Sequence, residues 1–365
     1  MPLGIPAQYW QGLSVAERSE VLVIGGGQAG LAAGYYLAQA RIPFLILDAE
    51  ADTGDSWRQR WDSLELFSAA CYSALPGLPF PGDPEHFPGK DTVADYLEDY
   101  AQAFELPIRH RSRVTSLDRR GGGYRAATES GEYQAAQVII AAGAYQQAWV
   151  PPLSDKLASD VIQLHSAGYR NPGQLPAREV LVVGAANSGA QIAEDLAATH
   201  RVHLSQGARI PRLPRRLLGQ SVHFYGDHLG LIAAPLEGSW RGRTQRGDLL
   251  IGTSLRQLRR RHSVDLRPRA TGASGHAVSF ADGSELDVQT VIWATGYRSD
   301  YSWIHPPVLD SHGAPVHQRG VTPAPGLYFL GMKNQYSRGS SLIGWVRHDA
   351  AFIVNHIRQA RDGPA

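Results

Sequence analysis

The chain has 365 residues, of which 43% are hydrophobic and 19% are charged, and it contains 39 Gly and 23 Pro. This composition excludes a disordered chain, a collagen and a coiled coil, and the length is enough for two globular domains of roughly 150 residues each. Cys71 is the only cysteine, and no Cys/His cluster has the spacing of metal ligands, so we predict neither a disulfide scaffold nor a metal site.

The N-terminal region gives no sign of secretion or membrane insertion. Residues 1–20 lack the basic start and apolar core of a signal peptide. Residues 21–40 are nearly uncharged and almost long enough to span a bilayer, but they include five glycines, Gln28 and two tyrosines. We therefore expect a cytoplasmic protein without a membrane segment.

The first elements in the chain are a strand, a helix and a second strand. Residues 21–24 are an apolar run closed by glycines, which is typical of a parallel strand buried on both faces. Small and apolar residues recur at helical spacing over residues 28–41, and residues 44–47 form a second buried strand that ends at Asp48.

A glycine motif joins the first strand to the helix. Gly25, Gly27 and Gly30 form G-x-G-x-x-G, which allows a tight turn, close approach of a pyrophosphate, and close packing of helix on strand. The start of the helix offers free N–H groups and a partial positive charge to that anion. Asp48 lies 18 residues beyond Gly30, where a carboxylate accepts hydrogen bonds from a ribose. The motif predicts a dinucleotide site.

The same order of elements recurs later in the chain. The predicted elements are strands over residues 180–183 and 202–204, a helix over 188–199 between them, and returning strands over 137–141 and 291–293. Turns are predicted within residues 128–134 and 281–285, so each nucleotide-binding unit should carry a small antiparallel meander.

The second copy of the glycine motif, over residues 184–189, departs from the first. Ala186 stands where a second glycine is usual, so a methyl group should lie where the backbone meets a phosphate. We expect looser or slightly displaced binding, and a degenerate turn kept for packing is the alternative. The strand that follows ends in Ser205 and Gln206 rather than in an acid, with Arg209 and Arg212 close behind. This arrangement favours a ribose that carries a 2′-phosphate, and therefore NADPH over NADH.

Positive charge is concentrated in the middle of the chain. The net charge is +1, but residues 201–270 contain 14 Arg, no Lys and four acidic residues, a local charge of +10. A phosphate-bearing ligand is the favoured explanation, and a solvated surface is the alternative. Arg259, Arg260 and Arg261 lack the interleaved aromatic residues of a nucleic-acid patch, so no nucleic-acid partner is expected.

Two dinucleotide sites in one chain form a productive pair when FAD receives hydride from a nicotinamide nucleotide. Because Cys71 has no C-x-x-C partner, reduction of a dithiol, as in thioredoxin reductase, is not expected.

Seven motifs follow one another in a specific order. They occupy residues 54–58, 61–64, 75–81, 163–169, 187–193, 294–297 and 326–331. In this order they resemble the flavin-containing monooxygenases, and most of all the short bacterial members of that class of flavoprotein. The resemblance covers residues 21–357.

The resemblance implies an α/β fold with two Rossmann-like dinucleotide-binding domains. An NADPH domain, residues 154–296, would be inserted into an FAD domain, residues 1–153 and 297–365. The residues implied to bind FAD are Gly25, Gly27, Gln28, Ala29, Gly30, Asp48, Trp57, Arg58, Val114, Gly331, Ser341 and Leu342. Among them, Val114 would meet the adenine, Gly331 the pyrophosphate, and Ser341 and Leu342 the flavin ring. The residues implied for the nicotinamide nucleotide are Asn187, Ser188, Gly189, Gln191, Ser205, Gln206 and Arg209. The resemblance also implies cofactor-binding positions, assigned to neither nucleotide, at His165, Ala294, Thr295 and Gly296.

The sequence departs from the family pattern at three places. Ser159 and Val161 replace the Phe and Gly that precede the fingerprint histidine, so His165 is either an interdomain hinge residue or an ordinary loop histidine. Gln206 and Gly207 replace the basic and hydroxyl residues of strict NADPH users, which leaves NADH as an alternative donor. The asparagine that many members place near the flavin has no counterpart in residues 64–72, and we assign no catalytic residue.

The resemblance implies that NADPH reduces the flavin, which then combines with O₂ to give a C4a-(hydro)peroxyflavin. One oxygen atom would pass to a sulfide (sulfoxidation) or an amine, or to a ketone in a Baeyer–Villiger reaction. The expected partners are O₂ and a small organic substrate, and a homodimer is left open. The alternatives are an NAD(P)H oxidase or flavin electron-transfer reductase, a nucleotide-sensing regulatory subunit of a transporter, and a nucleic-acid binder.

Overall fold

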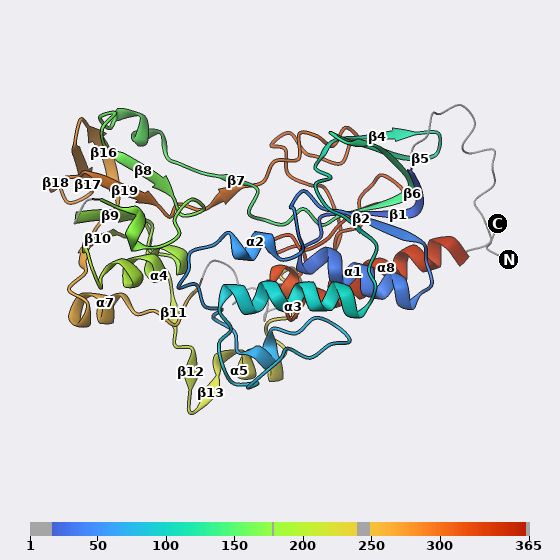
Figure 1. Ribbon diagram of the computed structural model, residues 1–365, viewed down its shortest axis with the longest axis horizontal. Coiled ribbons are helices and arrows are strands. Elements are labelled where there is room, and N and C mark those ends of the chain that lie inside the picture. The colour runs from blue at the N-terminus through green and yellow to red at the C-terminus, as the bar shows by residue number, and fades with distance from the viewer. Residues whose placement is uncertain (1–16, 177–178, 239–248, 363–365) are drawn as a thin grey trace.

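The computed structural model describes residues 17–176, 179–238 and 249–362. The signal-peptide prediction for residues 1–20 falls mostly outside the described residues. Three arginines of the arginine-rich stretch, Arg241, Arg243 and Arg246, also lie outside them. Two sheets lie at opposite ends of the long axis of the molecule (Figure 1). Within the described part of the chain, no helix is long and apolar enough to cross a membrane.

The first sheet has seven strands in the order β3-β2-β1-β6-β5-β4, with β21 also paired to β6. The strands are β1 (Glu17–Ile24), β2 (Phe44–Leu47), β3 (Ile108–Arg109), β4 (Val114–Arg120), β5 (Gly123–Thr128), β6 (Gly131–Ile140) and β21 (Leu327–Phe329). Strands β1, β2, β3, β6 and β21 are parallel, and β4-β5-β6 form the predicted antiparallel meander.

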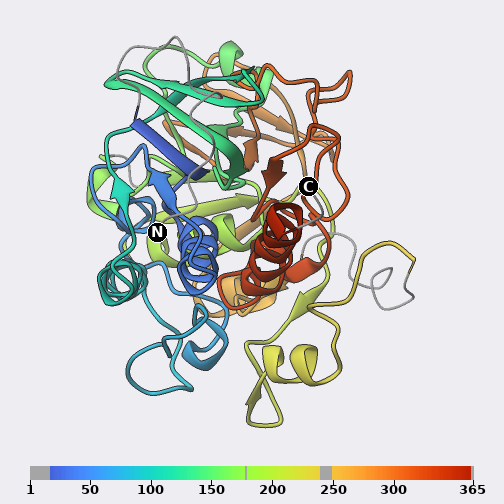
Figure 2. The same ribbon diagram turned by 90° about the vertical axis from the view of Figure 1, so that its right-hand side faces the viewer.

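Both faces of the first sheet are covered, which explains the uninterrupted apolar run in β1. Val21 and Val23 face the core formed with the helices, whereas Leu22 and Ile24 face a second core on the other side. The helices are α1 (Gln28–Gln39), α3 (Lys90–Ala103) and α8 (Val346–Asp362), and they lie side by side on one face of the sheet (Figure 2). Helix α1 ends two residues earlier than predicted, because Arg41 adopts a positive φ of 54°.

The second sheet has five parallel strands in the order β15-β10-β9-β19-β8. These are β8 (Ile162–His165), β9 (Glu179–Val183), β10 (Arg201–Ser205), β15 (Asp265–Arg267) and β19 (Thr290–Trp293), with helices α4 (Asn187–Leu196) and α7 (Leu255–Arg261) nearby. A separate meander, β16 (Ala270–Ser274), β17 (Ala277–Phe280) and β18 (Glu285–Asp287), contains the second predicted turn. The fold is therefore α/β with two Rossmann-like units.

The second unit is an insertion, because all of its strands come between β6 and β21 of the first sheet. The chain crosses between the units through β7 (Gln147–Ala148) and β20 (Tyr297–Arg298), which pair with each other in antiparallel fashion (Figure 1). The boundaries placed at residues 153/154 and 296/297 lie beside this pair and stay predictions.

An arm, defined here as residues 212–236, leaves the second unit and reaches the first. It contains β11 (Arg212–Leu213), β12 (Arg216–Leu217), β13 (Gln220–Ser221) and α5 (Val222–His228), and β11 pairs with β14 (Leu250–Ile251). In Figure 1 the hairpin β12-β13 and α5 lie below α3, away from both sheets. The short helices α2 (Asp55–Arg58), η2 (Ala70–Tyr72), η3 (Pro152–Lys156), η4 (Pro172–Gln174) and η5 (Arg338–Ser341) complete the structure.

Candidate functional site

The turn between β1 and α1 is shaped by glycines with different roles. Gly25 has a φ of 112°, and a side chain there would overlap the carbonyl oxygen of Ala141. A side chain at Gly30 would overlap the Gly25 carbonyl oxygen. At Gly27, in contrast, an added Cβ would meet no atom within 4 Å. The first and third glycines therefore pack the turn, and the second faces open space.

That open space lies at the start of a helix that no side chain caps. Gly27 is the N-cap of α1, and the first turn of the helix contains no acidic residue. The first N–H groups of a helix carry partial positive charge and can bind a phosphate. The geometry of this end of α1 fits a pyrophosphate.

Asp48 follows β2 beside this turn and is 8% exposed. Its Oδ1 accepts a hydrogen bond from the Glu50 N–H at 3.2 Å, and burial raises the pKa of its carboxyl group. The Asp48 carbonyl accepts from the Ser112 N–H at 2.7 Å, which brings the chain before Val114 alongside the end of β2. The structure thus places Asp48 beside the glycine turn and the segment that precedes Val114 beside Asp48.

The C-terminal part of the chain closes against the start of α1. Gln28 Nε2 donates a hydrogen bond to the Ser341 carbonyl oxygen at 2.8 Å. Gly331 has a φ of 79°, and a Cβ there would lie only 2.6 Å from the Cβ of Ala29. The predicted flavin residues Gln28, Ala29, Gly331, Ser341 and Leu342 therefore gather around one helix end, although they come from opposite ends of the sequence.

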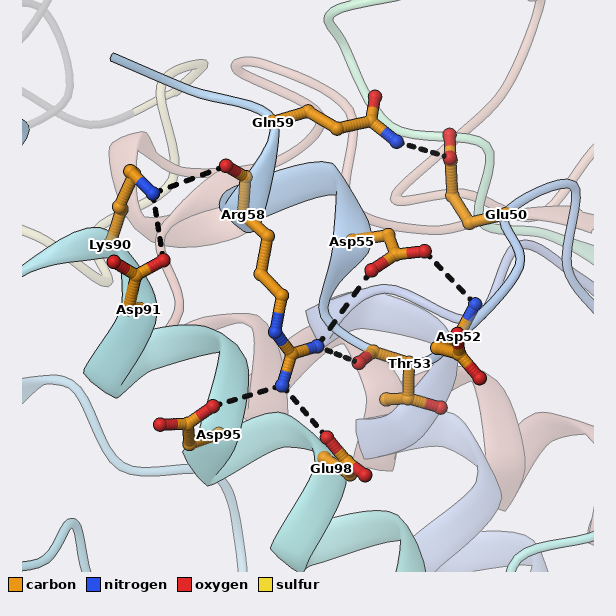
Figure 3. A network of polar contacts seen from close by, with 10 residues as sticks. All are labelled: Glu50, Asp52, Thr53, Asp55, Arg58, Gln59, Lys90, Asp91, Asp95 and Glu98. Carbon is orange, nitrogen blue, oxygen red and sulfur yellow. Dashed lines mark hydrogen bonds and ion pairs between the residues drawn. The ribbon is translucent and has the colours of Figure 1, made fainter. Parts of the chain in front are cut away.

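Trp57 and Arg58 lie in α2, but Arg58 is engaged with the protein. Its guanidinium donates to Asp95 at 2.9 Å and Glu98 at 2.7 Å, both on α3, and to the Thr53 carbonyl at 2.8 Å (Figure 3). These contacts fasten α2 to α3, and the contact of Arg58 with FAD stays a prediction. Trp57 packs against the apolar cores of both units.

The second glycine turn has the same close contacts and similar backbone angles as the first. Gly184 has a φ of 108° and packs against the Ala294 carbonyl, and a side chain at Gly189 would overlap the Gly184 carbonyl. Ala186 has φ −78° and ψ −172°, the same values as Gly27. The backbone is therefore not displaced at Ala186, because these angles are open to any residue. The looser binding expected from its methyl group stays a prediction.

The side chains of α4 near this turn are held by neighbouring segments. Asn187 donates to the Leu249 carbonyl at 2.8 Å and accepts from the Ile251 N–H at 2.9 Å. Gln191 donates to the Glu65 carbonyl at 3.3 Å, while its buried Oε1 has no hydrogen-bond partner. Ser188, one residue beyond Asn187, is half-buried.

The end of β10 opens into a hollow of about 820 Å³. Gln206 and Arg209 line it as predicted, and Arg212, Arg256 and Arg267 add three more guanidinium groups. Ser205 is buried, and its hydroxyl donates to the Pro268 carbonyl at 2.8 Å and accepts from the Ala270 N–H at 3.1 Å. The hydroxyl of Ser205 is therefore used within the protein, whereas Arg209 is exposed toward the hollow.

His165 lies where the chain crosses between the two units. Its Nδ1 accepts from the Ala167 N–H at 3.1 Å, and its Nε2 lies 2.9 Å from the Gly296 carbonyl oxygen. Only the neutral ring with the proton on Nε2 satisfies both contacts, and burial lowers the pKa of His165. His165 therefore contacts Gly296, which directly precedes β20 at the crossing between the units. This contact favours the hypothesis of an interdomain residue over that of an ordinary loop histidine.

Sequence reasoning did not predict several contacts that join the two units. Arg60 donates to the Tyr297 hydroxyl at 2.7 Å, and Tyr297 contacts the His165 ring at a centroid distance of 4.9 Å. Trp61 is buried in the core of the second unit, and its Nε1 has no hydrogen-bond partner. Each contact pairs segments more than 100 residues apart, so no local pattern could reveal it. Thr295 donates to the Trp149 carbonyl and fixes the same crossing.

The described residues contain no group of three His, Cys, Asp or Glu side chains that could hold a metal. The fold and the two glycine turns are those of a protein with two dinucleotide-binding units. The family model described as pyridine nucleotide-disulphide oxidoreductase matches residues 22–210. The chain belongs to this family.

Comparisons with individual proteins narrow the assignment of the chain within this family. It is 46% identical to an uncharacterized CzcO-like oxidoreductase of Geobacillus kaustophilus over 93% of this chain and 98% of that protein. The structure of a flavin-containing monooxygenase from Stenotrophomonas maltophilia matches with a TM-score of 0.79 and 28% identity, over 94% of this chain and 99% of the other. A probable indole-3-pyruvate monooxygenase of Arabidopsis thaliana, YUCCA9, is 29% identical over 78% of this chain and 76% of its own length. The resemblance to the flavin-containing monooxygenases is confirmed, and the chain is an enzyme of that type.

Proposed function

We propose that this chain is an FAD-dependent monooxygenase that consumes NADPH and transfers one oxygen atom of O₂ to a small organic substrate, a sulfide, an amine or a ketone. The observation that carries the proposal is the pair of glycine turns in one chain, in which Gly27 and Ala186 share the same backbone angles. Two dinucleotides in one polypeptide allow hydride to pass from one ring to the other.

The residues of the first unit fit FAD. A pyrophosphate fits the open space at Gly27 and the uncapped start of α1. The ribose that follows it fits the buried carboxylate of Asp48. Bound FAD would supply the redox and oxygen-transfer chemistry. The protein would supply binding, orientation and a dry environment.

The residues of the second unit fit a nucleotide with a 2′-phosphate. An acid that would bind the free ribose of NADH is absent from the end of β10, and four arginines line the hollow there. Guanidinium groups bind phosphate through charge-assisted hydrogen bonds. This arrangement supports NADPH as the preferred donor, with NADH as a weaker one.

Apolar side chains pack at the boundary between the units. Trp57 contacts the cores of both units, and Trp61 and Leu64 of the first unit are buried in the core of the second. Apolar packing at this boundary would exclude water and protect a reactive oxygen species from wasteful release. The neutral ring of His165 would hold the β20 linker in place beside it.

An NADPH oxidase is the second candidate, and one observation favours it. Residues 64–72 hold no asparagine or glutamine, and the hydroxyls of Ser68 and Ser73 in this region bond to each other at 2.9 Å. This segment therefore offers no side-chain amide to the flavin.

The two candidates are separated by product analysis. Purified protein is supplied with NADPH in air and with a panel of thioethers, amines and ketones. Oxygenated product formed in step with NADPH consumption supports the monooxygenase. Hydrogen peroxide formed in step with NADPH, with no oxygenated product from any of the panel, supports the oxidase.

A further inference from the structure

The arm, residues 212–236, physically joins the two predicted nucleotide sites. It begins at Arg212, which lines the hollow at the end of β10. It ends at Leu236, whose N–H donates to the Tyr336 carbonyl oxygen at 2.9 Å. Tyr336 precedes the turn that carries Ser341 and Leu342, the residues predicted to lie at the flavin ring.

The centre of the arm contacts Trp345, which follows this turn and packs against it. The Nε1–H of Trp345 donates a hydrogen bond to Asp227 Oδ1 of α5 at 2.7 Å. Trp345 is 3% exposed, and its own N–H donates to the Leu342 carbonyl oxygen at 3.0 Å. Asp227 is therefore linked to Leu342 through a single intervening residue.

Two neighbouring rings pack against Trp345, and the hydrogen bond to Asp227 sets the direction of its indole N–H. The indole stacks on Tyr72 at a centroid distance of 6.0 Å with an interplanar angle of 4°, and His223 of the arm lies 5.6 Å from it. A side chain at Gly344 would overlap the Tyr72 carbonyl oxygen, so the backbone is also tightly packed here.

A second contact holds the other end of the turn. The Gly339 N–H donates to the Ile232 carbonyl oxygen of the arm at 2.9 Å. Pro235 and Ser337 form an isolated antiparallel bridge beside it. The turn η5 is thus bounded by the arm on one side and by Gln28 of α1, through Ser341, on the other.

The arm is itself fixed to the first unit. Arg215 pairs with Glu65 at 2.5 Å, Arg216 pairs with Glu85 at 2.8 Å, and both guanidinium groups lie over the ring of Phe87. These contacts hold the first part of the arm, before α5, against the first unit without involving Asp227.

We propose that Asp227 is a positioning residue for the flavin: it fixes Trp345, and through Trp345 it holds the Leu342 turn against the flavin ring. The proposal rests on the proposed function, because it needs FAD in the first unit. It also assigns to the inserted unit a part in shaping the flavin site of the other unit.

The test compares Asp227→Leu, Asp227→Asn and Tyr225→Phe in the full-length protein with FAD. Asp227→Leu leaves a buried indole N–H without a partner, whereas the oxygen of an asparagine still accepts its hydrogen bond. Tyr225→Phe is the matched control, because the Tyr225 hydroxyl bonds the Leu217 carbonyl from the same helix and does not touch Trp345. The readouts are the visible spectrum and fluorescence of bound FAD, its dissociation constant, and the rate constant of its anaerobic reduction by NADPH.

We expect Asp227→Leu to alter the flavin spectrum, raise the FAD dissociation constant roughly tenfold and slow flavin reduction, with the KM for NADPH unchanged. Asp227→Asn and Tyr225→Phe should match the unsubstituted protein. Should Asp227→Leu fail to fold, Trp345→Phe removes the same hydrogen bond and should give the same changes. The proposal is overturned if Asp227→Leu, or Trp345→Phe in its place, has the same FAD spectrum, dissociation constant and reduction rate as Tyr225→Phe. A parent protein that binds no FAD would instead contradict the proposed function.

Discussion

Gln28 and Ser341 are 313 residues apart in sequence, yet the Gln28 side chain donates a hydrogen bond to the Ser341 carbonyl oxygen at 2.8 Å. This contact ties the first helix of the chain to the turn that precedes its last helix. It brings the helix end predicted to bind a pyrophosphate close to the residues predicted to lie at the flavin ring.

The glycine turn of the first unit gives the sharpest test of FAD binding. A side chain at Gly27 meets open space and its φ of −78° suits any residue, so Gly27→Val should fold normally. The valine should nevertheless occupy the pyrophosphate cradle and give a colourless protein. In the absence of added FAD, the free energy of unfolding should stay within about 0.5 kcal/mol of the parent apoprotein.

Gly30→Ala is the contrasting variant. Its methyl group would overlap the Gly25 carbonyl oxygen, so the fold itself should be destabilised. Urea unfolding and absorbance of the purified proteins check both variants. A yellow Gly27→Val protein would contradict the assignment of the cradle.

Replacing Ala186 in the second glycine turn with glycine should raise the affinity for NADP⁺. Ala186 already has the backbone angles of Gly27, so Ala186→Gly should remove a methyl group without moving the chain. The dissociation constant for NADP⁺, measured by calorimetry, should fall. An unchanged constant would mean that the methyl group does not face the phosphates.

Arg209 should govern the choice between the two nicotinamide nucleotides. Arg209→Ala removes one guanidinium from the hollow and should raise the KM for NADPH about tenfold, with a much smaller effect on NADH. Arg259→Ala is the control, since this exposed arginine of α7 is not among the residues that line the hollow. Equal effects of Arg209→Ala on both donors would show that Arg209 does not touch a 2′-phosphate.

His223 predicts a specific dependence of stability on pH. Burial, assisted by Arg338, lowers the pKa of this imidazole from 6.5 to about 4. The unfolded chain therefore binds a proton near pH 6.5 that the folded protein does not bind until about pH 4. The free energy of unfolding should fall as pH drops through this window, by up to about 3 kcal/mol from this group, and should not fall further below it.

His223→Phe should remove that part of the pH dependence. The phenyl ring can still stack against Phe67, which lies 5.8 Å from the imidazole. Urea unfolding of both proteins at pH 7.5 and pH 5 gives the comparison. The same loss of stability in both proteins would assign the pH dependence to other groups.

The βαβ units could be predicted from sequence because their signals are local. Val21 to Ile24 are apolar without interruption since alternate residues face two different cores, and Gly25 and Gly30 mark a turn that no other residue fits. The hairpin turns were also predicted, since they depend on a few adjacent residues.

The connections between the units could not be predicted in the same way. The bonds of Arg60 to Tyr297 and of Asp227 to Trp345 join segments separated by 237 and 118 residues, and neither pair has a local signature. The motif at Arg58 predicts a cofactor contact, but it gives no sign that the guanidinium also binds two carboxylates of α3, whose proximity only the fold establishes. Local pattern therefore located the nucleotide turns, and tertiary packing decided how they are joined.

Anaerobic titration of the purified protein tests most directly whether the two units serve one reaction. The yellow absorbance of bound FAD is followed as NADPH is added without oxygen. The account predicts that one equivalent of NADPH bleaches the flavin and leaves NADP⁺ on the second unit. A flavin that stays oxidised in excess NADPH and NADH, or a protein that never holds both nucleotides at once, would contradict it.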